Sequence, residues 1–176
     1  MKVINWELID ESTDKERLPV GAYVVVITGA KDNPSREYIE FTYDIAEGPY
    51  KDHFSDDWGQ SNPWAHNFYR SYKETAFGMF KSFLKRLEES NPDFNIAEWQ
   101  ATSDEQALTG LLVGIVQQEE EYEANDGSIK TRTNVAKIIK ADDVRNGNFK
   151  LLDKKLLDGG SATTAKADVY DDIPFM

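Results

Sequence analysis

Aromatic and cationic side chains lie close together in one stretch of this chain, residues 58–85. Flat rings can stack on unpaired bases, and Lys and Arg can neutralise the phosphates that join those bases. The residues of this kind are Trp58, Trp64, Phe68, Tyr69, Arg70, Tyr72, Lys73, Lys81 and Lys85. Together they favour a surface that binds single-stranded nucleic acid without strong sequence preference.

Large aromatic residues are also the usual material of a hydrophobic core. We therefore expect about two of the five rings in this stretch to face a nucleic acid, with the others packed inside. Trp64 and Tyr69 are the preferred pair, because they lie nearest to Arg70 in a segment that has no regular pattern.

A second candidate site lies on the last predicted strand, where Lys130 and Arg132 are two residues apart and share one face. Two cations at this spacing can follow a phosphate backbone. They can equally pair across a hairpin with Glu119, Glu121 or Glu123 on the preceding strand. The sequence leaves both interpretations open.

A third candidate site is the segment DVYDDIPFM at residues 168–176. Asp171 and Asp172 can meet a basic rim on a partner protein, and Ile173 and Phe175 can enter apolar pockets. Pro174 restricts the backbone and lowers the entropy lost on binding. We expect this segment to bind partner proteins; the alternative is an acidic terminus that only improves solubility.

No residue pattern indicates an enzyme, a metal site or a cofactor. His53, Asp56, Asp57 and His66 match no known spacing of zinc or calcium ligands. The sequence also lacks a glycine-rich phosphate loop and a nucleophile motif. Since there are no cysteines, no signal-peptide pattern and no long apolar run, we expect a cytoplasmic protein that does not contact a membrane.

The formal net charge of −12 taken alone argues against nucleic-acid binding, which needs cations. The charges are unevenly distributed, however. Residues 7–16 and 119–126 each hold five acids, whereas residues 60–87 hold five basic residues and one acid. A basic, aromatic surface on an acidic protein is therefore compatible with the composition.

The elements that must position these residues are mostly strands. The expected strands are residues 22–30, 36–46, a third strand that begins within 51–58, 108–123 and 129–141. The apolar stripe of one helix is formed by Phe77, Phe80, Phe83, Leu84 and Leu87. Asn91-Pro92 should end that helix, with a short connector at 94–99. The Asp-Gly turn at 126–127 joins the last two strands in a hairpin that can extend as an arm.

This order of elements predicts a mainly β protein: a five-stranded OB-fold barrel with one helix between strands 3 and 4, a long hairpin arm and a disordered acidic tail. The barrel would comprise residues 1–157. Residues 158–176 would form the tail, because their small, polar and acidic composition has no periodicity.

The segment DDIPF, residues 171–175, resembles the acidic tip of bacterial and phage single-stranded DNA-binding proteins. The runs LPVGAYVVVITGAK, EYIEFTYDIAEGPYKDHF and LTGLLVGIV, within residues 18–140, resemble a family of phage proteins taken to be OB folds that bind single-stranded DNA. The resemblance implies a protein that coats DNA during replication or recombination and recruits enzymes through its tail. In that family the Phe usually stands last, whereas here Met176 follows Phe175.

The alternative function is that of an acidic phage protein that binds or inhibits a host enzyme without touching DNA. A hydrolase is a third class, but it would need clustered carboxylates that the sequence does not supply. The sequence leaves the oligomeric state open, although the arm could pair two copies of the chain.

Overall fold

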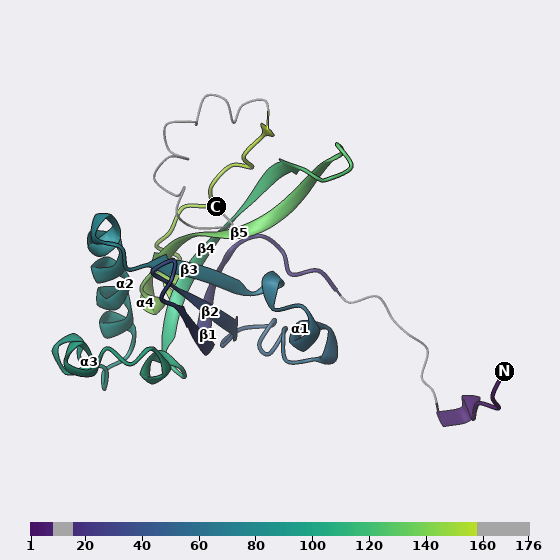
Figure 1. Ribbon diagram of the computed structural model, residues 1–176, viewed down its shortest axis with the longest axis horizontal. Helices are drawn as coiled ribbons and strands as arrows, with labels where there is room; N and C mark the ends of the chain where they lie inside the picture. Colours follow the sequence, from purple (N-terminus) through teal and green to yellow (C-terminus); the bar gives the residue numbers. More distant parts are fainter. Residues whose placement is uncertain (9–15, 158–176) are drawn as a thin grey trace.

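The computed structural model describes residues 1–8 and 16–157, and its centre is a five-stranded antiparallel sheet (Figure 1). The strands are β1 (Ala22–Asn33), β2 (Tyr38–Ile45), β3 (Asn67–Ser71), β4 (Leu112–Glu123) and β5 (Ile129–Ile139). Their order across the sheet is β3-β2-β1-β4-β5, so β3 and β5 are the outer strands. The prediction of a mainly β fold with five strands is confirmed.

The hairpin of β1 and β2 forms the middle of the core. Branched and aromatic residues alternate along both strands, which suits a sheet with one buried face. Ile27 pairs with Tyr43, and both are buried together with Phe41 and Ile45. This buried cluster is the base on which the helices and the outer strands pack.

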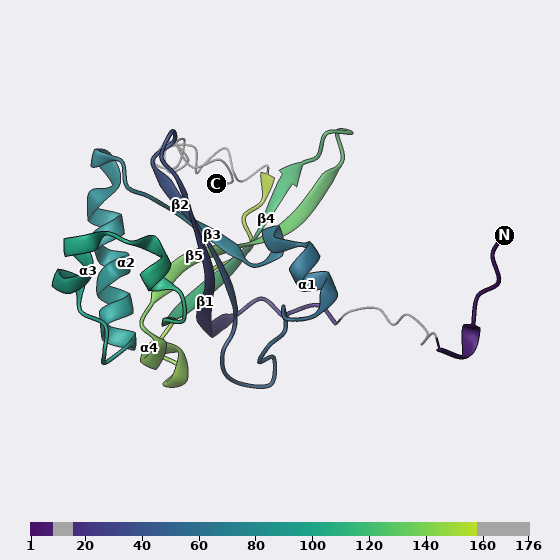
Figure 2. The same cartoon turned by 60° about the horizontal axis from the view of Figure 1, so that its bottom comes forward.

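Within residues 1–8 and 16–157, the α-helices that accompany the sheet and are described over their full length are α1 (Asp57–Ser61), α2 (Phe77–Ser90), α3 (Ile96–Thr102) and α4 (Ala141–Arg145). Short 3₁₀ helices occur at Trp6–Leu8, Pro63–Ala65, Glu74–Ala76 and Glu105–Leu108. The α2 helix buries Phe80, Phe83, Leu84 and Leu87, as its apolar stripe predicts. Phe77, the fifth residue of the stripe, is 58% exposed. Figure 2 shows α2 and α3 side by side, with α1 lying away from both.

Two predicted elements differ from the structure. The connector at 94–99 is the start of α3, because the Asn95 side chain accepts a hydrogen bond from the Glu98 amide at 3.0 Å and caps the helix. The region between β3 and β4 therefore holds two α-helices instead of one. The third strand does not begin within 51–58, where Asp56 caps α1; it is β3, inside the stretch predicted to be irregular.

The sheet is open in the structure. Hydrogen-bonded pairing ends at β3 on one side and at β5 on the other within the described residues. Cα atoms of β3 and β5 nevertheless approach within 8 Å, so the sheet curls until its two outer strands come close. The closed barrel of the sequence-based prediction is thus replaced by a curled open sheet.

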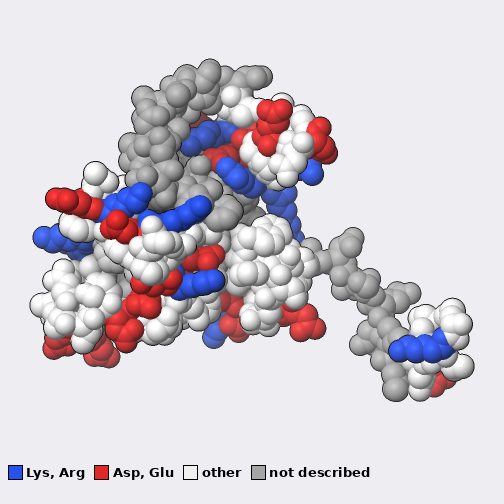
Figure 3. All heavy atoms as spheres, viewed as in Figure 1, with Lys and Arg blue, Asp and Glu red and all other residues white. Residues whose placement is uncertain are grey.

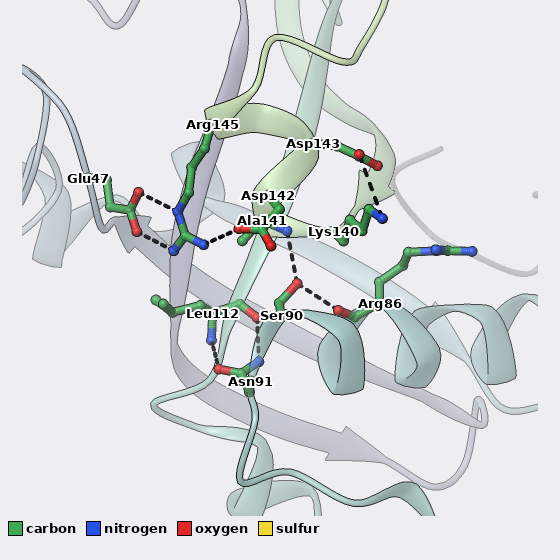
Figure 4. Close-up of polar contacts among 10 residues, drawn as sticks. All are labelled: Glu47, Arg86, Ser90, Asn91, Leu112, Lys140, Ala141, Asp142, Asp143 and Arg145. Atoms are coloured by element: carbon green, nitrogen blue, oxygen red, sulfur yellow. Dashed lines mark hydrogen bonds and ion pairs between the residues drawn. The ribbon is translucent and has the colours of Figure 1, made fainter.

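Side-chain hydrogen bonds fasten the end of α2 to the sheet (Figure 4). The Asn91 amide donates to the carbonyls of Leu87 and Leu112 at 2.8 and 2.7 Å, and its oxygen accepts from the Leu112 amide at 2.9 Å. The Ser90 hydroxyl accepts from the Ala141 amide at 2.9 Å. These bonds join α2, β4 and α4 where the predicted Asn91-Pro92 stop ends the helix.

Arg145 of α4 reaches across the sheet surface to the segment after β2 (Figure 4). Its guanidinium donates to Glu47 at 2.9 Å and to Asp142 at 2.7 Å. The hydrogen bond from Arg145 lowers the pKa of the Glu47 carboxyl below its ordinary value. All three side chains are well exposed, so this network contributes little to stability.

The β4–β5 hairpin extends beyond the rest of the sheet as an arm (Figure 1). β1 pairs with β4 only between Leu112 and Val116, whereas β5 accompanies β4 as far as Glu123. The turn contains Gly127 at φ 82°, a conformation that glycine adopts without strain. The predicted arm is therefore present. The predicted disordered tail, residues 158–176, lies outside the described residues.

Candidate nucleic-acid interface

A groove of about 1120 Å³ lies between the outer strand β5 and the segment that joins β2 to β3. We call it the seam groove, because Asn67 of β3 and the stretch 131–134 of β5 both line it. Among the predicted site residues, it brings together Trp58, Trp64 and Arg132.

Two tryptophan rings form one wall of the seam groove. Trp58 on α1 is 42% exposed, and Trp64 on the following 3₁₀ helix is 68% exposed. Their ring centroids are 6.1 Å apart, in an edge-to-face arrangement. Indole rings bury large areas when they are packed, so two adjacent exposed indoles are a costly arrangement for a surface that has no ligand.

Buried contacts hold the segment that carries these rings. The Asp44 carboxylate accepts the Phe54 amide at 2.9 Å, and Phe54 stacks on the His66 ring with centroids 4.6 Å apart. Gly59 of α1 packs against Phe54 so closely that a Cβ there would lie 2.1 Å from the Phe54 carbonyl oxygen. These buried contacts therefore fix the segment in place, with Trp58 and Trp64 on its exposed side.

Arg132 supplies a cation to the opposite wall, and it already has an anionic partner. Its Nε donates to Glu120 at 2.8 Å, and its guanidinium lies 4.9 Å from the ring centroid of Tyr122. Lys155 approaches the other Glu120 oxygen at 3.8 Å. A guanidinium has five donors, so Arg132 can contact a phosphate while it keeps Glu120.

The register of the arm selects Glu120 as the partner of Arg132. These two residues face each other across the hairpin, and paired residues share a face of the sheet. The acids named in the sequence analysis, Glu119, Glu121 and Glu123, are the register partners of Thr133, Thr131 and Ile129. Cross-strand pairing is thus present, but the predicted partners were wrong by one residue.

The charges of the seam groove are balanced. Its lining includes the cations Arg17 and Arg132 and the acids Glu16 and Asp56. On the face shown in Figure 3, Lys and Arg side chains are interspersed with Asp and Glu side chains and form no continuous basic surface. Any phosphate binding here depends on a few individual cations.

Phe68 and Tyr69, two predicted site residues, belong to the interior. Phe68 is buried and stacks on Phe41 with centroids 5.3 Å apart. Tyr69 is 8% exposed and donates to Glu40 at 3.2 Å; burial raises the pKa of its hydroxyl. Tyr69 is therefore not available for stacking on a base in this structure, which corrects the preferred pair of Trp64 and Tyr69.

Arg70 also has a packing role. Its guanidinium carbon lies 5.4 Å from the ring centroid of Phe68 and 5.6 Å from that of Phe83. Its Nη1 donates to the Tyr69 carbonyl at 2.8 Å. Arg70 therefore covers the aromatic core beside β3 instead of lining the seam groove.

Tyr72 and Lys81 line a second, smaller pocket of about 570 Å³. This pocket lies between α2, α3 and the end of β1, and Phe77 and Trp99 also line it. Tyr72 donates to Asp32 at 2.7 Å, and burial together with this hydrogen bond raises its pKa to about 12. The predicted site residues that line a pocket are thus divided between the seam groove and this second pocket.

The remaining predicted cations line neither pocket. Lys73 is half-buried after β3, Lys85 is exposed on α2, and Lys130 is exposed on the arm opposite Tyr122. Tyr122 and Arg17 also line the seam groove and were not among the predicted residues. A two-residue turn at Asp126-Gly127 would place Tyr122 opposite Thr131. The turn is one residue longer in the structure, where the Ala124 amide donates to the Ser128 carbonyl at 2.8 Å, and Tyr122 is therefore opposite Lys130.

In residues 1–8 and 16–157, no three His, Asp or Glu side chains form a group that could hold a metal ion. His66 and Asp56 have other contacts: His66 with backbone carbonyls, and Asp56 as the cap of α1. None of the helices in this part of the chain has the length and apolar character needed to cross a membrane.

Comparison with known proteins identifies no family. No protein-family model matches the chain, and no curated protein matches it.

Proposed function

We propose that this chain binds single-stranded DNA in the seam groove, without strong sequence preference, and coats and protects it during replication or recombination. The observation that carries the proposal is the exposed Trp58–Trp64 pair facing Arg132 and Tyr122 across one groove. Stacking platforms combined with a few cations are what unpaired nucleotides need, because every base has a flat face.

The proposal assigns separate roles to the two walls. Trp58 and Trp64 would stack on bases, each stacked base contributing about 1–3 kcal/mol. Arg17 and Arg132 would contact phosphates. Because the charges of the groove are balanced, the aromatic surface would supply most of the affinity. For the same reason, the affinity for DNA would depend only weakly on salt concentration for a protein of this class.

We further propose that the curled sheet is an open form of the OB barrel. A sheet in the order β3-β2-β1-β4-β5 closes into a barrel where β3 and β5 meet, and these strands already approach each other. OB folds are five-stranded, partly open barrels that bind oligonucleotides on strands 2 and 3 and with the loop between strands 4 and 5. The seam groove adjoins β3 and the arm of β4 and β5.

The recruitment of replication or recombination enzymes is assigned to residues 171–175, on sequence alone. The two acids would contact a basic rim on the partner enzyme, and the Ile and Phe side chains of Ile-Pro-Phe would enter apolar pockets on it. Their resemblance to the acidic tip of phage and bacterial single-stranded DNA-binding proteins supports this assignment.

A second candidate function is the binding of a host enzyme without DNA contact. The balanced lining of the seam groove and the Arg132–Glu120 ion pair favour it, since both reduce the attraction for phosphate. Exposed tryptophans are also frequent at the centres of protein interfaces.

A mobility-shift assay with oligo-dT at several salt concentrations separates the two candidates. The proposed function predicts a complex that weakens with salt and is competed by other single strands, but poorly by duplex DNA. Absence of a complex at low salt would reject it in favour of the second candidate.

A further inference from the structure

His66 is 5% exposed and contacts Gly59, the residue that follows Trp58 in α1. It follows the 3₁₀ helix Pro63–Ala65 that carries Trp64. Its ring stacks on Phe54 at an interplanar angle of 12° and meets Tyr43 edge to face at 6.3 Å. Because these neighbours fix the plane of the imidazole, the direction of both ring nitrogens is determined.

Each ring nitrogen points at a backbone carbonyl. Nδ1 is 2.7 Å from the Tyr43 oxygen of β2, and Nε2 is 2.8 Å from the Gly59 oxygen of α1. A carbonyl oxygen can only accept a hydrogen bond, and a neutral imidazole has a single N–H. In a neutral ring one of the two contacts would therefore bring two lone pairs together, inside the protein and away from water.

We infer that His66 is an imidazolium that donates from both ring nitrogens, and that it is the positioning residue which holds α1, and with it Trp58, against β2. The protonation state follows from the contacts alone. The consequence for DNA binding rests on the proposed function of the seam groove.

Three carboxylates belong to the elements that pack around His66. From β2, the Asp44 carboxylate is 7% exposed and accepts the amides of Ile45 and Phe54 at 2.8 and 2.9 Å. From α1 and its cap come Asp56, which accepts the Gly59 amide, and the exposed Asp57.

Two further titratable groups pack nearby. His53 meets Phe54 edge to face at 4.8 Å, on the residue whose other contact is His66. The Tyr43 hydroxyl belongs to the strand that supplies one of the carbonyls, and burial raises its pKa, so it stays neutral. His53 is the other histidine of the chain, so its signals have to be separated from those of His66 experimentally.

Loss of one proton would release one of the two carbonyls. If the Gly59 contact is lost, α1 keeps its cap and its packing on Phe54 but loses its hydrogen-bonded link to β2 through His66, and the geometry of the Trp58–Trp64 wall loosens. Binding in the seam groove should therefore be tightest where His66 carries both protons and should weaken as the pH rises through its titration.

Nitrogen NMR of the full chain, labelled with ¹⁵N-histidine, tests the protonation state. The chain has two histidines, so a His53→Asn variant leaves the His66 signals alone. At neutral pH we expect both His66 nitrogens to show the shifts of a protonated ring. Shifts of a single neutral tautomer would overturn the inference.

The positioning role has a separate readout, the tryptophan emission of the His53→Asn protein between about pH 6 and pH 9. We expect the emission and the oligo-dT affinity to change together with the His66 signals, with about tenfold weaker binding once the second proton is lost. Emission that stays constant while His66 titrates would contradict the positioning role.

A His66→Gln variant adds a check, because its side chain cannot carry a charge and its one NH2 group does not reproduce two donors on separate ring nitrogens. It should bind oligo-dT weakly and independently of pH over the range in which the His53→Asn protein changes. If the NMR result is as expected but no form of the protein binds oligo-dT, then the proposed function fails and the inference about His66 stands.

Discussion

Arg132 makes intramolecular contacts and also lines the proposed binding site. It pairs with Glu120 and lies over Tyr122, yet it lines the seam groove. The ion pair is partly exposed, so it contributes modestly to stability. Its larger effect is electrostatic, because Glu120 lowers the attraction of this wall for phosphate.

Replacing Glu120 by Gln should strengthen binding of single-stranded DNA by a few fold at low salt. The substitution removes the carboxylate that Arg132 and Lys155 share, so we expect the slope of log affinity against log salt to steepen by about 1. Fluorescence titrations with oligo-dT at several salt concentrations measure both quantities.

Glu121→Gln is the matched control, because it changes the net charge equally while its register partner is Thr131 on the other face of the arm. An equal gain in both variants would show that only net charge matters. No gain in Glu120→Gln would exclude Arg132 from the phosphate contacts.

Trp64→Leu should weaken binding by the value of one stacked base, about 1–3 kcal/mol or roughly 5- to 150-fold. Trp64 is 68% exposed, so its replacement should leave the free energy of unfolding nearly unchanged. Isothermal titration with oligo-dT and urea unfolding of the same sample test both statements.

Trp6→Leu serves as the control, since Trp6 is similarly exposed, at 64%, but does not line the seam groove. If this variant lost as much affinity as Trp64→Leu, the seam groove would not be the site at which DNA binds.

At the residue scale, the sequence predicted the kind of side chains but not their direction. Trp58 and Trp64 were among the predicted residues and face the groove, whereas Phe68 and Tyr69 are buried. The reason is that NFYRS was not recognised as a strand. Five residues between two helical segments are too few to show a clear period of two.

At the scale of elements, α1 is the part on which the Trp58 position depends. It has five residues, so it is too short to be stable without tertiary contacts. Asp56 caps it, Gly59 packs on Phe54, and His66 bonds to its carbonyl. The helix is therefore stabilised by its cap and by its tertiary contacts.

Gly59→Ala should destabilise the protein by about 1–3 kcal/mol, because the new Cβ would collide with the backbone of Phe54 and cannot be relieved by a side-chain rotation. We expect a lower midpoint in urea, and a shift of tryptophan emission because Trp58 is displaced.

Gly78→Ala is the matched control on α2, where a Cβ would meet nothing within 4 Å. It should raise the free energy of unfolding by about 0.5–1 kcal/mol, since glycine is unfavourable in a helix. Equal destabilisation by both substitutions would contradict the tight packing of Gly59.

The sequence predicted the longer elements well and the shorter ones poorly. β1, β2, α2 and the β4–β5 arm have long periodic patterns and clear turn residues, such as the Asp-Gly of the arm. α1, α3 and β3 are five to seven residues long, and their existence depends on caps and on packing. Pattern recognition has little signal for such elements.

At the scale of the whole molecule, the proposed DNA site at the open seam has to be reconciled with the acidic composition of the chain. The net charge is −12, and the seam groove contains acids as well as cations. A strongly acidic protein that binds DNA needs a local surface where stacking outweighs repulsion between the like charges of the protein and the phosphates. In the proposed function, the register and the curl of the sheet create that surface, and neither could be predicted from composition.

Deletion of residues 168–176 should tighten oligo-dT binding modestly at low salt, because it removes three acids that can compete with phosphate for cations. The difference should disappear at high salt, where such competition is screened. Unchanged affinity at low salt would show that this segment does not compete with DNA.

The central claim, that single-stranded DNA lies against the Trp58–Trp64 wall, is tested most directly by tryptophan quenching in two variants. The chain has four tryptophans. Trp6→Phe/Trp99→Phe keeps the groove pair, and Trp58→Phe/Trp64→Phe keeps the other two. Oligo-dT should quench the first variant strongly and leave the emission of the second nearly unchanged. Equal quenching of both, or quenching of the second alone, would contradict the proposed site.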